Sequence, residues 1–181
     1  CKDKRLTGIE REITLTRQAG ILLHPTSLPG GQISNAARDW LDFLNAAGVS
    51  LWQVLPLGVP QAGGSPYLCD SAFDINPALF SDCAYQPDGE RLIEFQSQQA
   101  AWLGPYCQFA ALKNHFNHTP WFDWPAEFRD REPAALQAFC DSHRAEIDHV
   151  ARQQCRLFDL WAEVRAEANA RGIAIFGDMP I

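Results

Sequence analysis

The chain has 181 residues, with 46% hydrophobic and 20% charged residues, ordinary values for a folded protein with one sizeable core. Its net charge of −7 argues against nucleic acid or an anionic membrane surface as a partner, because both favour basic patches. No apolar run approaches the ~20 residues that cross a bilayer, and residues 1–5 lack the apolar stretch of a signal peptide. We therefore expect a cytoplasmic protein.

The first predicted strand covers residues 19–24, where a short apolar run ends in the turn-rich segment 25–31. Residues 1–16 have no clear periodicity and are interpreted as an N-terminal arm or the end of a preceding domain. Ser34 is a candidate cap for a helix whose apolar face holds Ala37, Trp40, Leu41, Leu44 and Ala47, and Gly48 is the expected end of that helix. A second apolar run, residues 49–55, breaks at Pro56. The order strand–helix–strand predicts a parallel pair with a right-handed crossover.

A long insertion separates the second predicted strand from a further helix and a third strand. Residues 58–79 are loop-like and contain Ser65-Pro66-Tyr67, and residues 81–133 are mixed, with a helix expected around 109–112. Residues 134–171 show helical periodicity, Gly172 ends it, and residues 173–178 form the third predicted strand. This alternation predicts an α/β fold. Ser27, the Ser65-Pro66-Tyr67 loop and Asp178 fall at the C-terminal strand ends, where parallel α/β folds bind ligands.

The six cysteines are scattered and none belongs to a Cys-x-x-Cys pair, so neither a zinc clip nor a redox motif is visible. Reduced thiols are the expected state, although an even number leaves disulfides open. The cysteines are Cys1, Cys69, Cys83, Cys107, Cys140 and Cys155.

Several motifs together resemble the 4-α-glucanotransferases, also called amylomaltases or disproportionating enzymes. They occur in order and span residues 17–181. They are the opening strand at 19–29, the second strand at 51–58, Ser65-Pro66-Tyr67, the segments 71–73 and 76–77, and the third-strand motif at 177–181.

This resemblance implies the N-terminal portion of an α-amylase-like (β/α)8 TIM barrel with helical insertions, incomplete in this chain. Residues 17–181 would supply the first three strands, with an inserted subdomain at about 80–133. The resemblance also implies activity on malto-oligosaccharides and other α-1,4-glucans, and no metal or organic cofactor. The family uses a retaining double displacement, which needs two carboxyl groups roughly 5 Å apart. Its nucleophile and acid/base lie on later strands, so both are expected beyond Ile181 and none is assigned here.

Two residues match positions that contact substrate in the family. The resemblance implies that Tyr67 contacts a glucose ring beside the cleavage point, and that Asp178 holds the sugar and neighbouring catalytic groups by hydrogen bonds. The alternatives are a packed loop aromatic for Tyr67 and a cap or solvated turn residue for Asp178. Ser65, Asn76 and Ser27 are secondary candidates that shape the same rim.

The chain departs from the family pattern in two places. The loop between Pro29 and Ser34 is shorter than the family's, and so is the stretch between Pro77 and Tyr106. Our hypothesis is therefore a native polypeptide longer than 181 residues. An α-glucan hydrolase of the same barrel type and a non-catalytic glucan-binding protein remain alternative functions, and the oligomeric state is left open.

Overall fold

The computed structural model describes residues 17–81 and 87–179, so the predicted arm at 1–16 lies outside the described residues. The described strands are β1 (Gly20–Leu22), β2 (Leu51–Gln53) and β3 (Ala174–Phe176), which form one parallel sheet in the order β1-β2-β3. The predicted α/β class is confirmed. Each strand is shorter than predicted. For the first two, proline follows closely at positions 25 and 56, and proline has no N–H to continue the ladder.

Helix α1 (Asn35–Ala46) connects β1 to β2 and begins where the sequence predicts. The hydroxyl of Ser34 accepts a hydrogen bond from the backbone N–H of Ala36 at 3.3 Å, which satisfies one of the free donors of the first turn. Gly48 follows the helix with φ of 69°, a conformation that suits glycine. The face made by Ala37, Leu41 and Leu44 is buried as predicted, whereas Ala47 at the helix end is exposed.

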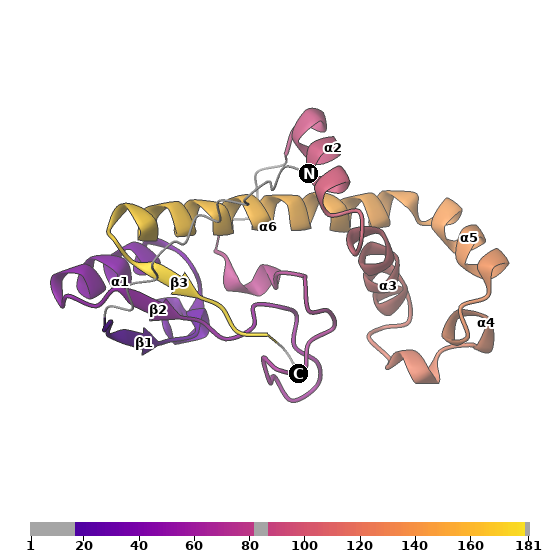
Figure 1. Cartoon of the computed structure of the whole chain (residues 1–181). Helices are drawn as coiled ribbons and strands as arrows, with labels where there is room; N and C mark the ends of the chain where they lie inside the picture. The colour runs from indigo at the N-terminus through magenta and orange to yellow at the C-terminus, as the bar shows by residue number, and fades with distance from the viewer. Residues whose placement is uncertain (1–16, 82–86, 180–181) are drawn as a thin grey trace, which may run out of the picture.

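Helix α6 (Arg144–Ala170) runs from α5 at one end to β3 at the other (Figure 1). A single helical stretch over 134–171 was predicted, but α5 (Pro133–Ser142) is separate and the helix is interrupted at His143. The Ser142 hydroxyl donates to the carbonyl oxygen of Ala138 at 2.9 Å, and the ring Nδ1 of His143 lies 3.1 Å from the carbonyl oxygen of Phe139. Such local side-chain bonds compete with the helical ladder, which explains the break.

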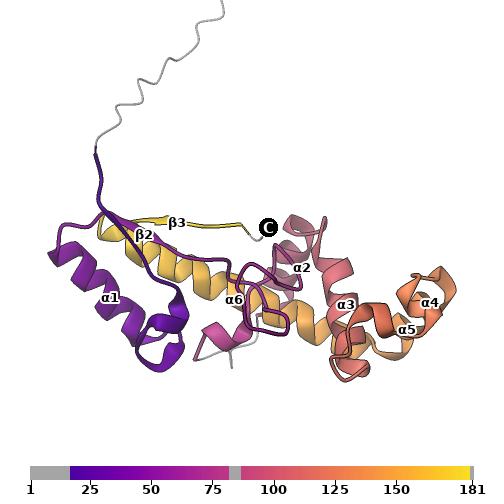
Figure 2. The same ribbon diagram turned by 90° about the horizontal axis from the view of Figure 1, so that it is seen from below.

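Helices α1 and α6 lie on the same side of the sheet (Figure 2). Ile21, Trp52 and Ile175 are neighbours in the register of the three strands, and they pack into the cluster that also holds Leu44 and Ala168. The Trp52 side chain is fully buried, and its indole N–H donates to the carbonyl oxygen of Leu23 at 2.8 Å. Trp52 therefore packs in the core.

The other face of the sheet is open in the described part of the chain. Leu22 and Phe176, which flank Gln53 in the register, are 53% and 60% exposed. The sheet is therefore covered on one side only, and the uncovered side carries large apolar side chains.

A helical region precedes α6 and packs against its N-terminal half. Helix α3 (Leu103–His115) confirms the predicted helix around 109–112, whereas α2 (Gly89–Gln98) was not predicted. Asp88 caps α2, because its side chain accepts a hydrogen bond from the backbone N–H of Arg91 at 2.8 Å. The boundary of the predicted inserted subdomain stays a prediction. The helices of this region are α2 (Gly89–Gln98), α3 (Leu103–His115) and α4 (Ala126–Arg129), and short 3-10 turns occur at Pro25–Ser27, Pro29–Gly31, Pro77–Leu79 and Trp121–Asp123.

Within residues 17–81 and 87–179, no helix combines the length and the apolar character needed to cross a membrane. The same residues contain no cluster of three or more His, Cys, Asp or Glu side chains that could hold a metal ion. The four cysteines at 69, 107, 140 and 155 are free thiols, whereas Cys1 and Cys83 lie outside the described residues.

Candidate functional site

The carboxyl ends of β2 and β3 meet beside a hollow of about 450 Å³, here called the rim hollow. Asp178, two residues beyond β3, lines it together with residues that follow β2 and with the inner side of α6. A smaller neighbouring hollow of about 240 Å³ also contains Asp178. The residues that line the rim hollow include Pro56, Asp74, Arg91, Trp161, Arg165 and Asp178.

Tyr67 and Asp178 are brought together although they lie 111 residues apart in the sequence. The Tyr67 hydroxyl donates to Oδ2 of Asp178 at 2.8 Å, while Oδ1 of Asp178 accepts from the backbone N–H of Met179 at 2.9 Å. The hydrogen bond to Asp178 raises the pKa of Tyr67, so the phenol stays a donor. Tyr67 is 37% exposed, and its ring is accessible from outside.

Two of the three secondary candidates, Ser65 and Asn76, make hydrogen bonds that shape their loops. The Ser65 hydroxyl lies 3.4 Å from the backbone N–H of Tyr67 and accepts a weak bond from it. Asn76 caps the turn at 77–79, because its side-chain oxygen accepts from the N–H of Ala78 at 3.0 Å. Ser27 lies exposed in the turn after β1, and no described contact joins it to Tyr67 or Asp178. Their roles in substrate binding stay predictions.

Tyr67 lies near the tip of a hairpin-like segment, residues 57–75, here called the rim loop. Backbone hydrogen bonds hold its two arms together. The N–H of Gln61 donates to the carbonyl oxygen of Leu68 at 2.8 Å, and the N–H of Asp70 donates to the carbonyl oxygen of Val59 at 2.9 Å. At the base, Gly58 approaches its neighbours so closely that a Cβ there would come within 2.7 Å of Oδ1 of Asp74. The rim loop is thus a compact unit.

Buried polar side chains that were not among the predicted site residues fix the base of the rim loop. Asp74, only 4% exposed, accepts bonds at Oδ2 from the N–H of Val59 and from the hydroxyl of Tyr106, both at 3.0 Å. Gln154 of α6, 1% exposed, makes two bonds of 2.9 Å with the backbone N–H and carbonyl of Ile75. A signal was present for Gln154, because it interrupts the apolar stripe of the long helix.

Burial raises the pKa of Asp74 to about 6, although the bonds from Val59 and Tyr106 oppose the shift. Its Oδ1 atom is buried without a hydrogen-bond partner among the described residues. Asp70 is also close enough to raise the pKa further by charge repulsion. Ionisation of Asp74 therefore costs more free energy in the folded protein than in the unfolded chain.

The stability should therefore depend on pH through Asp74. Because the folded pKa lies above that of the unfolded chain, the proton stabilises the folded state fully below about pH 4, and this contribution is lost as the pH rises through about 6. Asp74→Asn keeps an acceptor oxygen but does not ionise. The stability of the unchanged protein relative to Asp74→Asn should thus fall by on the order of 2–3 kcal/mol between about pH 4 and 7, measured by urea unfolding. A difference that is constant with pH would contradict the assignment.

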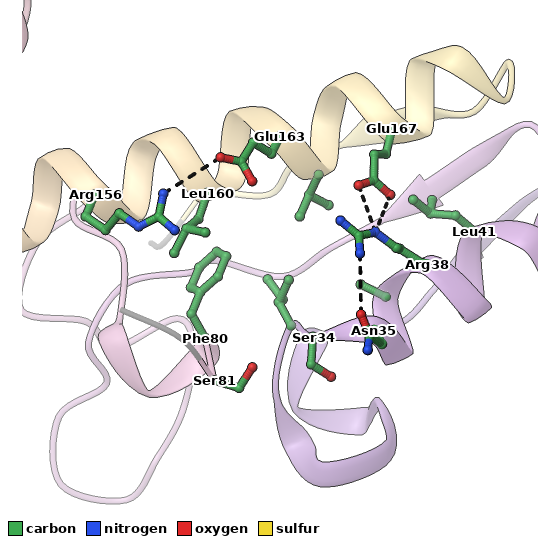
Figure 3. A pocket seen from close by; sticks show the side chains of 13 residues that line it. Ser34, Asn35, Arg38, Leu41, Phe80, Ser81, Arg156, Leu160, Glu163 and Glu167 are labelled. Atoms are coloured by element: carbon green, nitrogen blue, oxygen red, sulfur yellow. Dashed lines mark hydrogen bonds and ion pairs between the residues drawn. The ribbon is translucent and has the colours of Figure 1, made fainter. Parts of the chain in front are cut away.

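A second hollow, of about 350 Å³, lies between α1 and α6 (Figure 3). At its edge Arg38 donates from Nε to Glu167 at 2.9 Å, and Arg156 lies 3.7 Å from Glu163, while apolar side chains such as Leu160 form the floor. None of the predicted site residues lines it. Of the predicted site residues, Asp178 alone lines the rim hollow, and Tyr67 is joined to it by the hydrogen bond to Asp178. The rim hollow and the Tyr67–Asp178 pair therefore form the candidate site.

Comparison with known proteins gives the family of this chain. The family model described as 4-alpha-glucanotransferase matches residues 23–85 and 79–181. This chain belongs to the 4-alpha-glucanotransferase family. The resemblance found in the sequence motifs is thereby confirmed. The two matched ranges overlap at residues 79–85.

Curated relatives come from bacteria and plants. The 4-alpha-glucanotransferases of Synechocystis and Thermus thermophilus are 35% and 36% identical to this chain, cover 91% and 92% of it, and are themselves covered over 43% of their length. The chloroplastic/amyloplastic 4-alpha-glucanotransferase of Arabidopsis thaliana is 32% identical over 91% of this chain and 37% of its own length. The chain spans less than half the length of these relatives.

Among solved structures, the amylomaltase from Streptococcus agalactiae in complex with acarbose is similar in fold, with a TM-score of 0.80 and 26% identity. The similarity covers 91% of this chain and 43% of the amylomaltase. The fold is accordingly that of part of an amylomaltase, as the sequence predicted.

Proposed function

We propose that this protein is a 4-α-glucanotransferase that moves α-1,4-glucan segments between malto-oligosaccharides by a retaining double displacement. The observation that carries the proposal is the Tyr67–Asp178 pair, held at 2.8 Å at the carboxyl edge of the sheet in a chain of this family. An amylomaltase of similar fold has been solved with acarbose, which supports an oligosaccharide as ligand.

In this reaction the nucleophilic carboxylate attacks C1 of a glucosyl unit while the acid protonates the departing 4-oxygen, so the glycosidic bond breaks and a covalent glucosyl–enzyme forms. The 4-hydroxyl of another glucan then attacks C1, gives its proton to the same residue acting as base, and releases the carboxylate. We assign neither group within this chain. Its own contribution is binding: Tyr67 offers a ring face, and Asp178 accepts hydrogen bonds from sugar hydroxyls.

The proposal includes a closed (β/α)8 barrel, of which β1, β2 and β3 are the first strands. The exposed Leu22 and Phe176 support it, because barrel closure would bury that face of the sheet. It also includes an inserted subdomain at about 80–133, α-glucans as the partners, and a cytoplasmic location, although the Arabidopsis relative is chloroplastic/amyloplastic.

The test is product analysis after incubation of the full-length protein with maltotriose. A transferase makes longer glucans together with glucose, whereas a hydrolase makes only shorter sugars. A glucan-binding protein would leave maltotriose unchanged. Either of the last two results would overturn the proposal in favour of the corresponding alternative.

Tyr67→Ala should weaken the use of short malto-oligosaccharides while leaving thermal stability nearly unchanged, because the side chain is partly exposed. Ring stacking and the phenol hydrogen bond together should contribute on the order of 1–2 kcal/mol to substrate binding. The measurement is KM for maltotriose beside a thermal melting curve, with Tyr67→Phe as the comparison that keeps the ring. A large fall in melting temperature with unaltered kinetics would return Tyr67 to a packing role.

A further inference from the structure

The rim loop is attached to helix α3 by two polar contacts at its base. The Tyr106 hydroxyl donates to Oδ2 of Asp74 at 3.0 Å, and Nζ of Lys113 lies 2.6 Å from Oδ2 of Asp70. The second pair is largely enclosed, since the side chains of Lys113 and Asp70 are 20% and 9% exposed. Both acceptors belong to the rim loop and both donors to α3.

We propose that Tyr106 and Lys113 are positioning residues, which fix the rim loop so that Tyr67 meets Asp178 and holds a short malto-oligosaccharide. This inference rests on the proposed function. It assigns the control of a binding contact to a helix that contributes no residue to the lining of the rim hollow.

The hairpin geometry explains how α3 acts at a distance. Because backbone bonds join the arms at Val59–Asp70 and Gln61–Leu68, the loop responds as a unit when its base shifts. Near its tip, the rim loop contacts the segment after β3 through the hydrogen bond from Tyr67 to Asp178. The place of the Tyr67 ring is therefore set by the base, where Asp70 and Asp74 are held.

The chemistry at the base favours a positioning role over simple packing. Tyr106 is packed among apolar rings such as Trp102, where a phenylalanine would pack equally well, yet its hydroxyl points to a buried carboxylate. Burial raises the pKa of Tyr106 well above the usual range, so it remains a donor at all ordinary pH values. A carboxylate that accepts from both a loop N–H and a helix hydroxyl joins the two elements in one geometry.

The test uses Tyr106→Phe and Lys113→Met in the full-length protein, with Gln108→Met as the matched control. Gln108 also lies on α3, but its hydrogen bond goes to Sγ of Cys140 and not to the rim loop. Each of the first two variants should raise KM for maltotriose about five- to tenfold with kcat within about threefold, while the control stays within about twofold of the unchanged protein. In a Tyr67→Ala background, Tyr106→Phe should add less than about twofold to KM, because the contact it positions is already gone.

Hydrogen–deuterium exchange supplies a readout that needs no activity. Amides of residues 57–75 should exchange at least about tenfold faster in Tyr106→Phe and unchanged in Gln108→Met. Unchanged exchange in the rim loop overturns the inference, as does an equal rise of KM with and without Tyr67. Failure of the unchanged protein to elongate maltotriose overturns the proposed function instead, so the two failures are distinguishable.

Discussion

Asp178→Asn should fold normally and lower kcat/KM for maltotriose at least tenfold. The change keeps the shape of the side chain and removes its charge. Charge-assisted hydrogen bonds from sugar hydroxyls or a neighbouring cation are worth roughly 1.5–3 kcal/mol, and a loss of about 1.4 kcal/mol already corresponds to one decade in rate. Both oxygens are oriented, one by Tyr67 and one by the N–H of Met179, so the charge is presented in a fixed direction.

The loss should be equal for transfer and for any residual hydrolysis, because both begin with formation of the glucosyl–enzyme. Asp39→Asn is the matched control, since Asp39 is an exposed carboxylate on α1, and it should change kcat/KM by less than about twofold. Full activity of Asp178→Asn on maltotriose would place Asp178 among the residues that only shape the strand end.

Gln154→Leu should lower the free energy of unfolding by about 4 kcal/mol. Gln154 satisfies both the N–H and the carbonyl of Ile75, and leucine can satisfy neither. Each buried backbone group left without a partner costs roughly 1–3 kcal/mol, which outweighs the better transfer of leucine into the interior. Urea denaturation of the full-length protein measures the change.

The neighbouring Gln153 offers the control for this experiment. It lies on the same helix and is only partly buried, and its side chain makes no hydrogen bond to the described residues. Gln153→Leu should therefore change the free energy of unfolding by less than about 0.5 kcal/mol. Similar losses in the two variants would show that helix α6 tolerates neither leucine, and that the bonds to Ile75 are not the cause.

Local signals predicted the parts of the fold that depend on neighbouring residues. The cap at Ser34, the helix ends at Gly48 and Gly172, and three apolar strands follow from short-range rules, and the structure confirms them. The sequence also predicts that Tyr67 and Asp178 lie at the same edge of the sheet, because the carboxyl ends of parallel strands point the same way. It does not predict the hydrogen bond between them.

The rest depends on contacts between distant segments. In the sequence Asp74 is an ordinary loop residue. Its role depends on the hydroxyl of Tyr106, which lies on α3, 32 residues away in the sequence. The break between α5 and α6 depends on the Ser142 hydroxyl, which donates to the carbonyl oxygen of Ala138 in its own helix. The spacing of apolar residues does not predict such a bond. Helix α2 was not predicted, and its role in the fold depends on the contacts of two buried side chains, Leu92 and Phe95, with α6.

The length of α6 has a consequence for protein engineering. At 27 residues it is about 40 Å long, and it contributes to the clusters beside the sheet and to those beneath the preceding helices. A shortened protein without residues 87–142 would leave Val150, Ala151 and Cys155 facing water, since these side chains pack against α2 and α3. Chimeras between relatives should therefore exchange residues 87–142 together with the N-terminal half of α6. The side chains of the two segments pack against each other in one hydrophobic cluster.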